Sequence, residues 1–334
     1  SFANSLDNSG IACKALFPSM IRCSCILGGF SKKREFIGTI LPPFSQLQYT
    51  YLEFMSTAFL FPGQGSQSVG MGAELFSRFP DIVEQSDEIL GYSIEELCLR
   101  EDATDLNLTN FTQPALYTVS CLQAKALLEE GKSPSFAAGH SVGEFAALQC
   151  ANAFSFADGL QMVAKRGEIM SKVSGGGMAA VIGMDADKIT SVLEEQGADQ
   201  IDLANFNSPG QIVISGPAPQ IAQVLSPLKD GGARMVVPLK VSGAFHSRMM
   251  NEPAMQFSEF LKDFSFRSPE FPVFSNVEAQ PYSTTDAIPE LLIKQIFSPV
   301  RWTDLIQGLR QKNIEEFIEC GPGKVLTKLL RQIP

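Results

Sequence analysis

The chain has 334 residues, of which 45% are hydrophobic and 19% charged, a balance typical of a globular enzyme with a substantial core. No apolar run reaches the ~20 residues that a membrane-spanning helix needs, so we expect no membrane insertion. The formal net charge of −10 disfavours nucleic acid as a partner, because an acidic surface repels a phosphate backbone.

Residues 1–54 differ from the rest of the chain, with five basic and three acidic residues and poor periodicity. One interpretation is an organelle transit segment, since acidic residues are sparse up to Arg34. The other is an upstream extension without structural consequence, because Met55 directly precedes the first expected strand and would be a natural start for a bacterial enzyme. We favour the extension and a cytoplasmic location; a transit segment would imply a plastid or mitochondrion. In either case we expect the segment to be poorly ordered.

The cysteines are seven, an odd number, and they are scattered along the chain. They are Cys13, Cys23, Cys25, Cys98, Cys121, Cys150 and Cys320. Because no pair has the spacing of a zinc site, we expect reduced thiols and no metal site.

From residue 55 to residue 175, short apolar strands alternate with helices, which predicts a parallel α/β core. Strands are expected at 57–61 and from Phe136, and helices at 71–79, 82–90, 114–130, 144–151 and 156–173. The C-terminal part adds expected strands at 271–275 and 316–318 and an expected helix at 325–330.

From Met178 the predicted order becomes β-α-β-β-α-β, the signature of a ferredoxin-like domain. The expected strands are 178–184, 201–204, 211–215 and 233–241, and the expected helices are 187–196, capped by Asp185, and 219–229. We therefore expect a small domain at 176–241 inserted into a hydrolase-like large domain formed by 55–175 and 242–334. The glycines at 175–177 indicate a hinge rather than a phosphate loop, since no Lys-Ser/Thr follows them and a strand comes next.

The pentapeptide Gly139-His140-Ser141-Val142-Gly143 follows an apolar strand and precedes a helix. This is the context of a nucleophile elbow, in which glycines permit a sharp turn and the serine hydroxyl stands clear of the sheet. A G-x-S-x-G pattern also occurs by chance, so it needs a base within hydrogen-bond reach before it indicates catalysis.

The chain contains two histidines, His140 and His246. His140 lies inside the elbow and is badly placed to reach Ser141, whereas His246 follows it in the chain order of α/β-hydrolase-type enzymes. Because His246 comes just after the expected small domain, the nucleophile and the base would meet in the cleft between the domains.

Several motifs in order together resemble one family, the malonyl-CoA:acyl carrier protein transacylases, which share the acyltransferase fold of fatty-acid and polyketide synthases. The matching segments are Phe61-Pro62-Gly63-Gln64-Gly65-Ser66-Gln67, Phe111-Thr112-Gln113-Pro114-Ala115, Gly139-His140-Ser141-Val142-Gly143-Glu144, Lys165-Arg166-Gly167, Gly243-Ala244-Phe245-His246-Ser247 and Glu319-Cys320-Gly321-Pro322-Gly323-Lys324-Val325-Leu326. The resemblance runs from about residue 57 to the end.

The resemblance implies a role for each matching residue. Ser141 would carry the acyl group as an ester and His246 would be its general base, oriented by the backbone carbonyl of Gln295. The backbone N–H groups of Gln64 and Val142 would form the oxyanion hole, which can stabilise a transition state by ~3 kcal/mol per donor. Two residues would contact the acyl group: Arg166 would clamp the malonyl carboxylate in a bidentate pair, and the bulk of Phe245 would favour malonyl over methylmalonyl.

The implied reaction moves malonyl from coenzyme A to the phosphopantetheine thiol of an acyl carrier protein in two steps, supplying fatty-acid synthesis. The resemblance implies no cofactor and a monomer. Since the carrier partner in this family is acidic, docking would use local basic residues. The candidates are Arg234, Lys240, Arg248, Arg301 and Lys324.

Three alternatives stay open. The enzyme could load a polyketide synthase, because the chemistry is the same. It could be a serine thioesterase or hydrolase, which predicts a carboxylate holding His246 and no need for Arg166. A non-catalytic scaffold is disfavoured, because every expected reactive residue is present. Asn205 and Asn207 could line the entrance from the small domain, but the simpler interpretation is that they cap a turn before Pro209.

Overall fold

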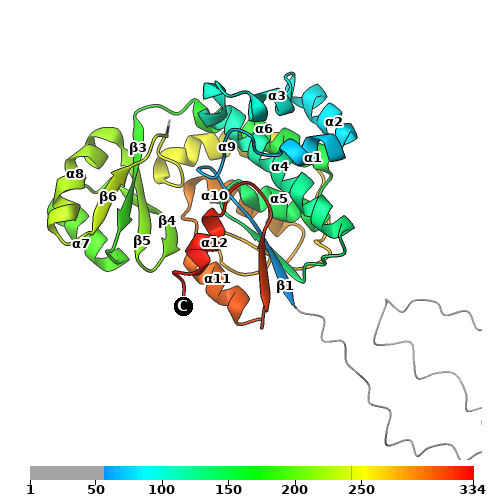
Figure 1. Ribbon diagram of the computed structural model, residues 1–334. Helices are drawn as coiled ribbons and strands as arrows, with labels where there is room; N and C mark the ends of the chain where they lie inside the picture. The colour runs from blue at the N-terminus through cyan, green and yellow to red at the C-terminus, as the bar shows by residue number, and fades with distance from the viewer. Residues whose placement is uncertain (1–55, 242) are drawn as a thin grey trace, which may run out of the picture. The chain divides into compact units, whose positions relative to one another are not determined.

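The computed structural model describes residues 56–241 and 243–334, and the fold is shown in Figure 1. The expectation of poor order in residues 1–54 and those for Cys13, Cys23 and Cys25 fall outside the described residues. The other four cysteines are buried free thiols.

The first sheet is parallel and has the strand order β7-β2-β1-β8. Its strands are β1 (Thr57–Phe61), β2 (Phe136–Gly139), β7 (Val273–Phe274) and β8 (Glu316–Glu319). All five residues of β1 are buried, as expected for a central parallel strand covered on both faces. Strands β1 and β2 end in register, Phe61 opposite Gly139, and the serine motif begins at that edge.

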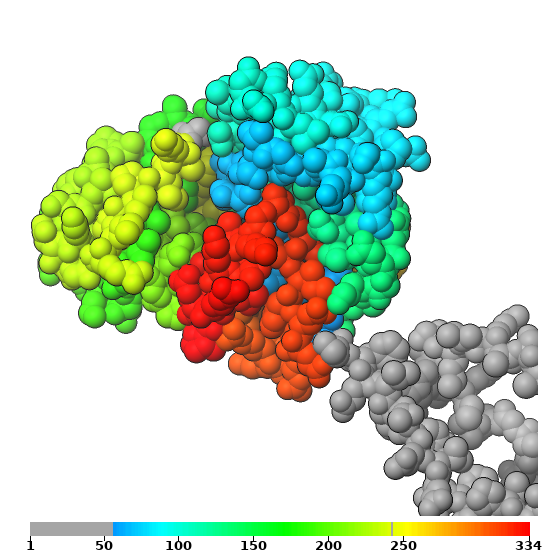
Figure 2. All heavy atoms as spheres, in the orientation of Figure 1, coloured from blue at the N-terminus to red at the C-terminus, as the bar shows by residue number. Residues whose placement is uncertain are grey.

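Ten α-helices belong with this sheet among the described residues: α1 (Ala73–Arg78), α2 (Pro80–Leu90), α3 (Ile94–Leu99), α4 (Thr109–Glu129), α5 (Gly143–Cys150), α6 (Phe156–Ser171), α9 (Asn251–Leu261), α10 (Ala287–Phe297), α11 (Trp302–Arg310) and α12 (Val325–Leu330). Short 3₁₀ turns lie at Thr104–Asn107 (η2) and Arg248–Met250 (η3). Figure 2 shows the red C-terminal segment packed beside the blue segment that follows β1, in agreement with the pairing of β1 with β8.

The expected start of the long helix at Pro114 is wrong, because α4 begins at Thr109 and contains Pro114. The proline removes one backbone hydrogen bond of the helix. The nearly continuous burial of residues 112–122 compensates, and the Thr112 hydroxyl donates to the Leu106 carbonyl at 2.6 Å to hold the first turn.

The second sheet is antiparallel, with the order β4-β5-β3-β6. Its elements are β3 (Gly176–Ile182), α7 (Ala186–Glu195), β4 (Asp202–Ser208), β5 (Gln211–Pro217), α8 (Ala218–Asp230) and β6 (Met235–Pro238). Helices α7 and α8 lie together against the sheet and share one apolar core with it (Figure 1). The Asp185 side chain accepts from the Lys188 N–H at 2.9 Å, so the expected helix cap is present.

The α/β fold class with a parallel sheet and a ferredoxin-like second sheet is confirmed. The domain boundaries at 176 and 241 stay predictions. The strands differ from expectation at their ends: β4 continues to Ser208, and β6 is limited to Met235–Pro238. β4 continues because its edge finds a partner outside its own sheet. Phe206 N–H donates to the Val300 carbonyl and Val300 N–H donates to the Ala204 carbonyl, both at 2.9 Å.

We predict that Gly143→Ala destabilises the fold by about 3 kcal/mol, because an added Cβ would overlap the backbone of Phe61 where β1 meets α5. Urea unfolding would measure the loss. Gly210→Ala is the control, since nothing lies within 4 Å of a Cβ placed there. Equal stability of the two variants would contradict the close approach of β1 to the turn.

Candidate active site

Ser141 occupies a strained turn between β2 and α5. Its φ of 52° lies in the left-handed region, which a residue with a side chain adopts only when its surroundings hold it there. Asn276 provides that support from the loop after β7: its Oδ1 accepts from the Ser141 N–H at 2.7 Å, and its Nδ2 donates to the Gly139 carbonyl at 2.6 Å. The turn therefore has the geometry of a nucleophile elbow.

The side chain of His246 meets that of Ser141, with 2.8 Å between the serine Oγ and the histidine Nε2. The other ring nitrogen, Nδ1, lies 2.8 Å from the Gln295 carbonyl oxygen and 3.2 Å from the Ser298 carbonyl oxygen. Because both of these partners only accept, Nδ1 carries the proton and Nε2 is free to accept the serine hydroxyl.

Burial, and secondarily the nearby cation of Arg166, lower the pKa of His246 to about 3. Its ring is therefore neutral near pH 7, the form that a general base requires. His140 does not compete for this position: its Nε2 lies 2.8 Å from Asn207 Oδ1, and its ring packs against Trp302 with 5.4 Å between centroids.

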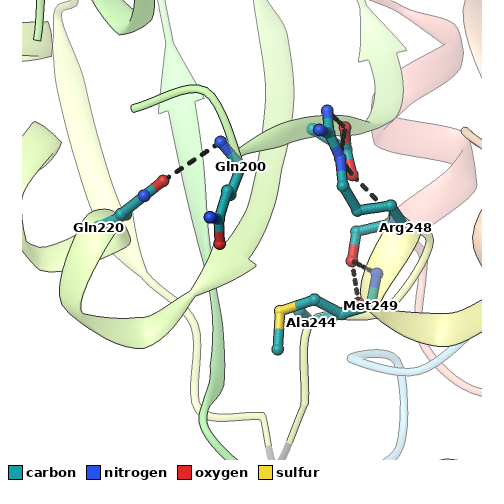
Figure 3. Close-up of polar contacts among 7 residues, drawn as sticks. Gln200, Gln220, Ala244, Arg248 and Met249 are labelled. Atoms are coloured by element: carbon teal, nitrogen blue, oxygen red, sulfur yellow. Dashed lines mark hydrogen bonds and ion pairs between the residues drawn. The ribbon is translucent and has the colours of Figure 1, made fainter. Parts of the chain in front are cut away.

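The segment around His246 is fixed by polar contacts on both sides, shown in Figure 3. The Ser247 hydroxyl donates to the Ala244 carbonyl at 2.6 Å and accepts from the Met249 N–H at 3.3 Å. Arg248 forms a bidentate pair with the Asp202 carboxylate at the start of β4: its Nη2 donates to Oδ1 at 2.6 Å and its Nε donates to Oδ2 at 3.1 Å. The histidine loop is thus tied to the second sheet.

Arg166 on α6 is 1% exposed and points at the same serine. Its Nη2 lies 3.2 Å from Ser141 Oγ and donates to Gln295 Oε1 at 2.9 Å, while Nη1 donates to Gln113 Oε1 at 2.7 Å. Burial lowers the pKa of Arg166 to about 10, which leaves it cationic at neutral pH. All three of these partners are uncharged, so no carboxylate hydrogen-bonds to the cation among the described residues.

A cavity of about 90 Å³ opens over these groups. Its apolar wall includes Met170, Met178, Leu239, Val241 and Phe245. Gln64 and Val142 also line it, and within residues 56–241 and 243–334 the backbone N–H of neither donates to another protein group. Two residues that line the cavity therefore have backbone N–H groups unused within the described chain, which is what the predicted oxyanion hole needs.

The structure brings together every site residue that was predicted, namely Ser141, His246, Arg166, Gln64, Val142, Phe245 and Gln295, around this cavity or in contact with its lining. Their roles stay predictions. The interpretation of Asn205 and Asn207 as turn caps is wrong: both lie within β4, Asn205 lines the cavity, and Asn207 contacts His140.

Sequence reasoning missed three residues that shape the site: Gln113, Glu144 and Asn276. Gln113 and Glu144 lie inside motifs that match the family, but the motifs alone assigned them no role. Asn276 had no signal, because only the fold brings the loop after β7 to the serine turn.

Among the described residues, no group of three or more His, Cys, Asp or Glu side chains is placed to hold a metal ion. In that same part of the chain, no helix is both long enough and apolar enough to cross a membrane.

The depressed pKa of His246 predicts a pH-dependent stability. The unfolded histidine takes up a proton below about pH 6.5 and the folded one does not, so stability present above that pH is lost as the pH falls. Between about pH 7.5 and pH 5 we expect the wild type to lose about 2 kcal/mol relative to His246→Asn. Urea unfolding of both proteins would measure this, and parallel pH dependences would contradict a buried neutral histidine.

Comparison with known proteins places this geometry in a family. Residues 58–333 match the acyl transferase domain family. The chain is 50% identical over 277 residues to the polyketide biosynthesis malonyl CoA-acyl carrier protein transacylase PksC of Bacillus subtilis, covering 82% of this chain and 96% of that protein. It is 42% identical over 280 residues to the malonyl CoA-acyl carrier protein transacylase of Synechocystis sp., covering 83% and 94%. It is also 49% identical to the polyketide biosynthesis protein ThaF of Burkholderia thailandensis, but spans only 24% of that protein.

Solved structures agree with these matches. A malonyl CoA-acyl carrier protein transacylase from Burkholderia pseudomallei superposes with a TM-score of 0.80 at 43% identity, covering 84% of this chain and 98% of the other. A malonyl-transacylase in complex with its type II polyketide synthase acyl carrier protein gives a TM-score of 0.80 at 36% identity, covering 83% and 93%. The chain belongs to the acyl transferase domain family.

Proposed function

We propose that this protein transfers a malonyl group from malonyl-CoA to the phosphopantetheine thiol of an acyl carrier protein, through an ester on Ser141. The observation that carries the proposal is the buried cation of Arg166, which lies 3.2 Å from the same serine Oγ that His246 contacts. A nucleophile, a neutral base and a cation for the acyl group's free carboxylate thus meet in one small cavity.

In the first step, Ser141 Oγ attacks the thioester carbonyl carbon while its proton passes to His246 Nε2. The carbonyl oxygen becomes an oxyanion that accepts from the N–H groups of Gln64 and Val142. When the carbon–sulfur bond breaks, His246 returns the proton to the coenzyme A sulfur. The acyl group remains on Ser141 as an ester.

The second step runs the same chemistry in reverse. The carrier thiol gives its proton to His246 and attacks the ester carbonyl, and Ser141 leaves as its oxygen regains that proton. Each step moves only protons and the acyl group, so we propose no metal or redox cofactor for either.

Arg166 selects the acyl group in this account. A malonyl carboxylate can accept two parallel hydrogen bonds from the guanidinium, which a lysine could not provide. An acetyl group would leave the buried cation unpaired, and this difference favours malonyl. Phe245, 6% exposed and lining the cavity, would crowd a methyl branch on the malonyl α-carbon.

The names of the relatives support a carrier-protein acceptor, and they include both polyketide transacylases and ones without a stated pathway. We propose that the enzyme supplies malonyl groups for fatty-acid or polyketide synthesis, and the proposal covers both pathways. The monomeric state, the cytoplasmic location and docking through Arg234, Lys240, Arg248, Arg301 and Lys324 stay predictions. Two of these arginines are already in ion pairs, Arg248 with Asp202 and Arg301 with Asp304.

A serine hydrolase is the second candidate. That alternative expects a carboxylate to hold His246, whereas the partners of its Nδ1 are the backbone carbonyls of Gln295 and Ser298. The geometry therefore favours the transferase.

We predict that Arg166→Ala lowers kcat/KM for malonyl-CoA by about 100-fold, corresponding to about 3 kcal/mol of lost ion pairing, while acetyl transfer is spared or improved. The measurement is the rate of acyl transfer to holo acyl carrier protein with each donor. Lys165→Ala is the control, because Lys165 pairs with Glu168 on the surface of the same helix. Equal losses with malonyl and acetyl donors in Arg166→Ala would refute the clamp.

A further inference from the structure

Glu144 is a fully buried carboxylate that the reaction above does not use. It lies in the first turn of α5, three residues after Ser141, and none of its surface is exposed. A carboxylate removed from water is costly unless donors surround it, so its presence in the core beside the serine turn calls for a role.

Three donors converge on this carboxylate. Oε1 accepts from the Asn276 N–H at 3.1 Å and from the Tyr282 hydroxyl at 2.6 Å, and Oε2 accepts from Gln295 Nε2. Burial raises the pKa of Glu144 to about 7, while these donors and Arg166 oppose the rise. Above that pH, the group is an acceptor on both of its oxygens.

Gln295 connects this carboxylate to the rest of the site. Its Nε2 donates to Glu144 and, at 3.0 Å, to the Ser141 carbonyl, while its Oε1 accepts from Arg166 Nη2 at 2.9 Å. Its backbone carbonyl accepts from His246 Nδ1. One residue therefore touches the nucleophile, the base and the cation.

The direction of the Gln295 amide depends on what it faces. The Ser141 carbonyl and Glu144 Oε2 are acceptors, so the NH₂ group of the Gln295 amide faces them. Arg166 is a donor, so the oxygen of the same amide faces the guanidinium. Removing the acceptor at Glu144 would weaken this preference. A reversed amide would present NH₂ to Arg166, two donors face to face.

We propose that Glu144 is a positioning residue for acyl selection: its carboxylate fixes the amide direction of Gln295, and Gln295 in turn aims the Arg166 guanidinium at the acyl group. The inference rests on the proposed malonyl transfer and deepens it. Glu144 touches no substrate in this account. It acts through the Gln295 side chain, and the backbone carbonyl that holds His246 is left in place.

The test is the ratio of kcat/KM for malonyl-CoA to that for acetyl-CoA, measured with holo acyl carrier protein at about pH 8, where Glu144 is ionised. Glu144→Gln preserves the shape but brings an NH₂ group to Gln295. We expect the ratio to fall by about tenfold or more, because aiming of the malonyl clamp is lost while the Ser141–His246 pair remains.

Tyr282→Phe is the matched control. It removes a donor from the same carboxylate on the Oε1 side, yet leaves Oε2 as the acceptor for Gln295. We expect its ratio to stay within about threefold of the wild type. An equal fall in both variants would indicate general loosening of the core and would overturn the proposal.

Gln295→Met separates the side chain from the backbone, since it keeps the carbonyl that His246 contacts. It should lower the ratio as Glu144→Gln does, and the double variant should be no worse than Gln295→Met alone, because both changes break one path. Additive losses would overturn the proposal. Should Glu144→Gln not fold, an unchanged ratio in Gln295→Met would overturn it alone.

Failure of the underlying function gives a different result. A wild type that transfers no malonyl group would refute the proposed function and this inference with it. A wild type that transfers malonyl, combined with an unchanged ratio in Glu144→Gln, would overturn only the role of Glu144.

Discussion

A positive charge kept out of water is the constraint on which the site depends. Burying a guanidinium costs several kcal/mol unless donors find acceptors, and Arg166 donates from Nη1 and Nη2 to the amide oxygens of Gln113 and Gln295, while its buried Nε has no partner among the described residues. No carboxylate accepts a hydrogen bond from Arg166 within the described residues, although the charge of nearby Glu144 favours the cationic form. Burial, and secondarily this cation, lower the pKa of His246, so the base stays neutral. The cation also provides a physical source for the proposed preference for an acyl group with its own carboxylate.

The fold supplies two further requirements for catalysis, a serine held in a sharp turn and a histidine held in a fixed position. Ser141 and His246 both have positive φ values, 52° and 56°, and each is held by contacts from distant segments. The serine turn is braced by Asn276 from the loop after β7. The histidine loop is tied to Asp202 of the second sheet and to backbone carbonyls at the end of α10. A small sheet placed between the serine and the histidine in sequence thereby closes the cavity in space.

Local patterns were sufficient to predict both sheets, because buried apolar strands and glycine turns carry short-range signals. The ferredoxin-like order was predicted from alternation alone. Helix α11 was missed although Trp302, Leu305, Ile306 and Leu309 have helical spacing and are all buried. Helices α9 and α10 were also not predicted. Each has a proline near its start, Pro253 or Pro289, and a proline interrupts most helices although it is tolerated in the first turn.

The site residues likewise fall into those that local sequence predicts and those that it does not. Ser141, His246 and Arg166 lie in motifs that could be matched one by one. The residues that support them could not be predicted, because Asn276, Gln113 and the Gln295 side chain reach the site only after strands and helices pack. Glu144 shows this most clearly: it stands three residues from the serine in sequence, yet its function depends on partners more than a hundred residues away.

The most direct test of the account is the intact mass of the protein after brief mixing with malonyl-CoA, for the wild type and for Ser141→Ala. The account predicts a mass increase of one malonyl group on the wild type alone, which holo acyl carrier protein then removes. Steady release of coenzyme A without any adduct, or an adduct that persists on Ser141→Ala, would contradict it.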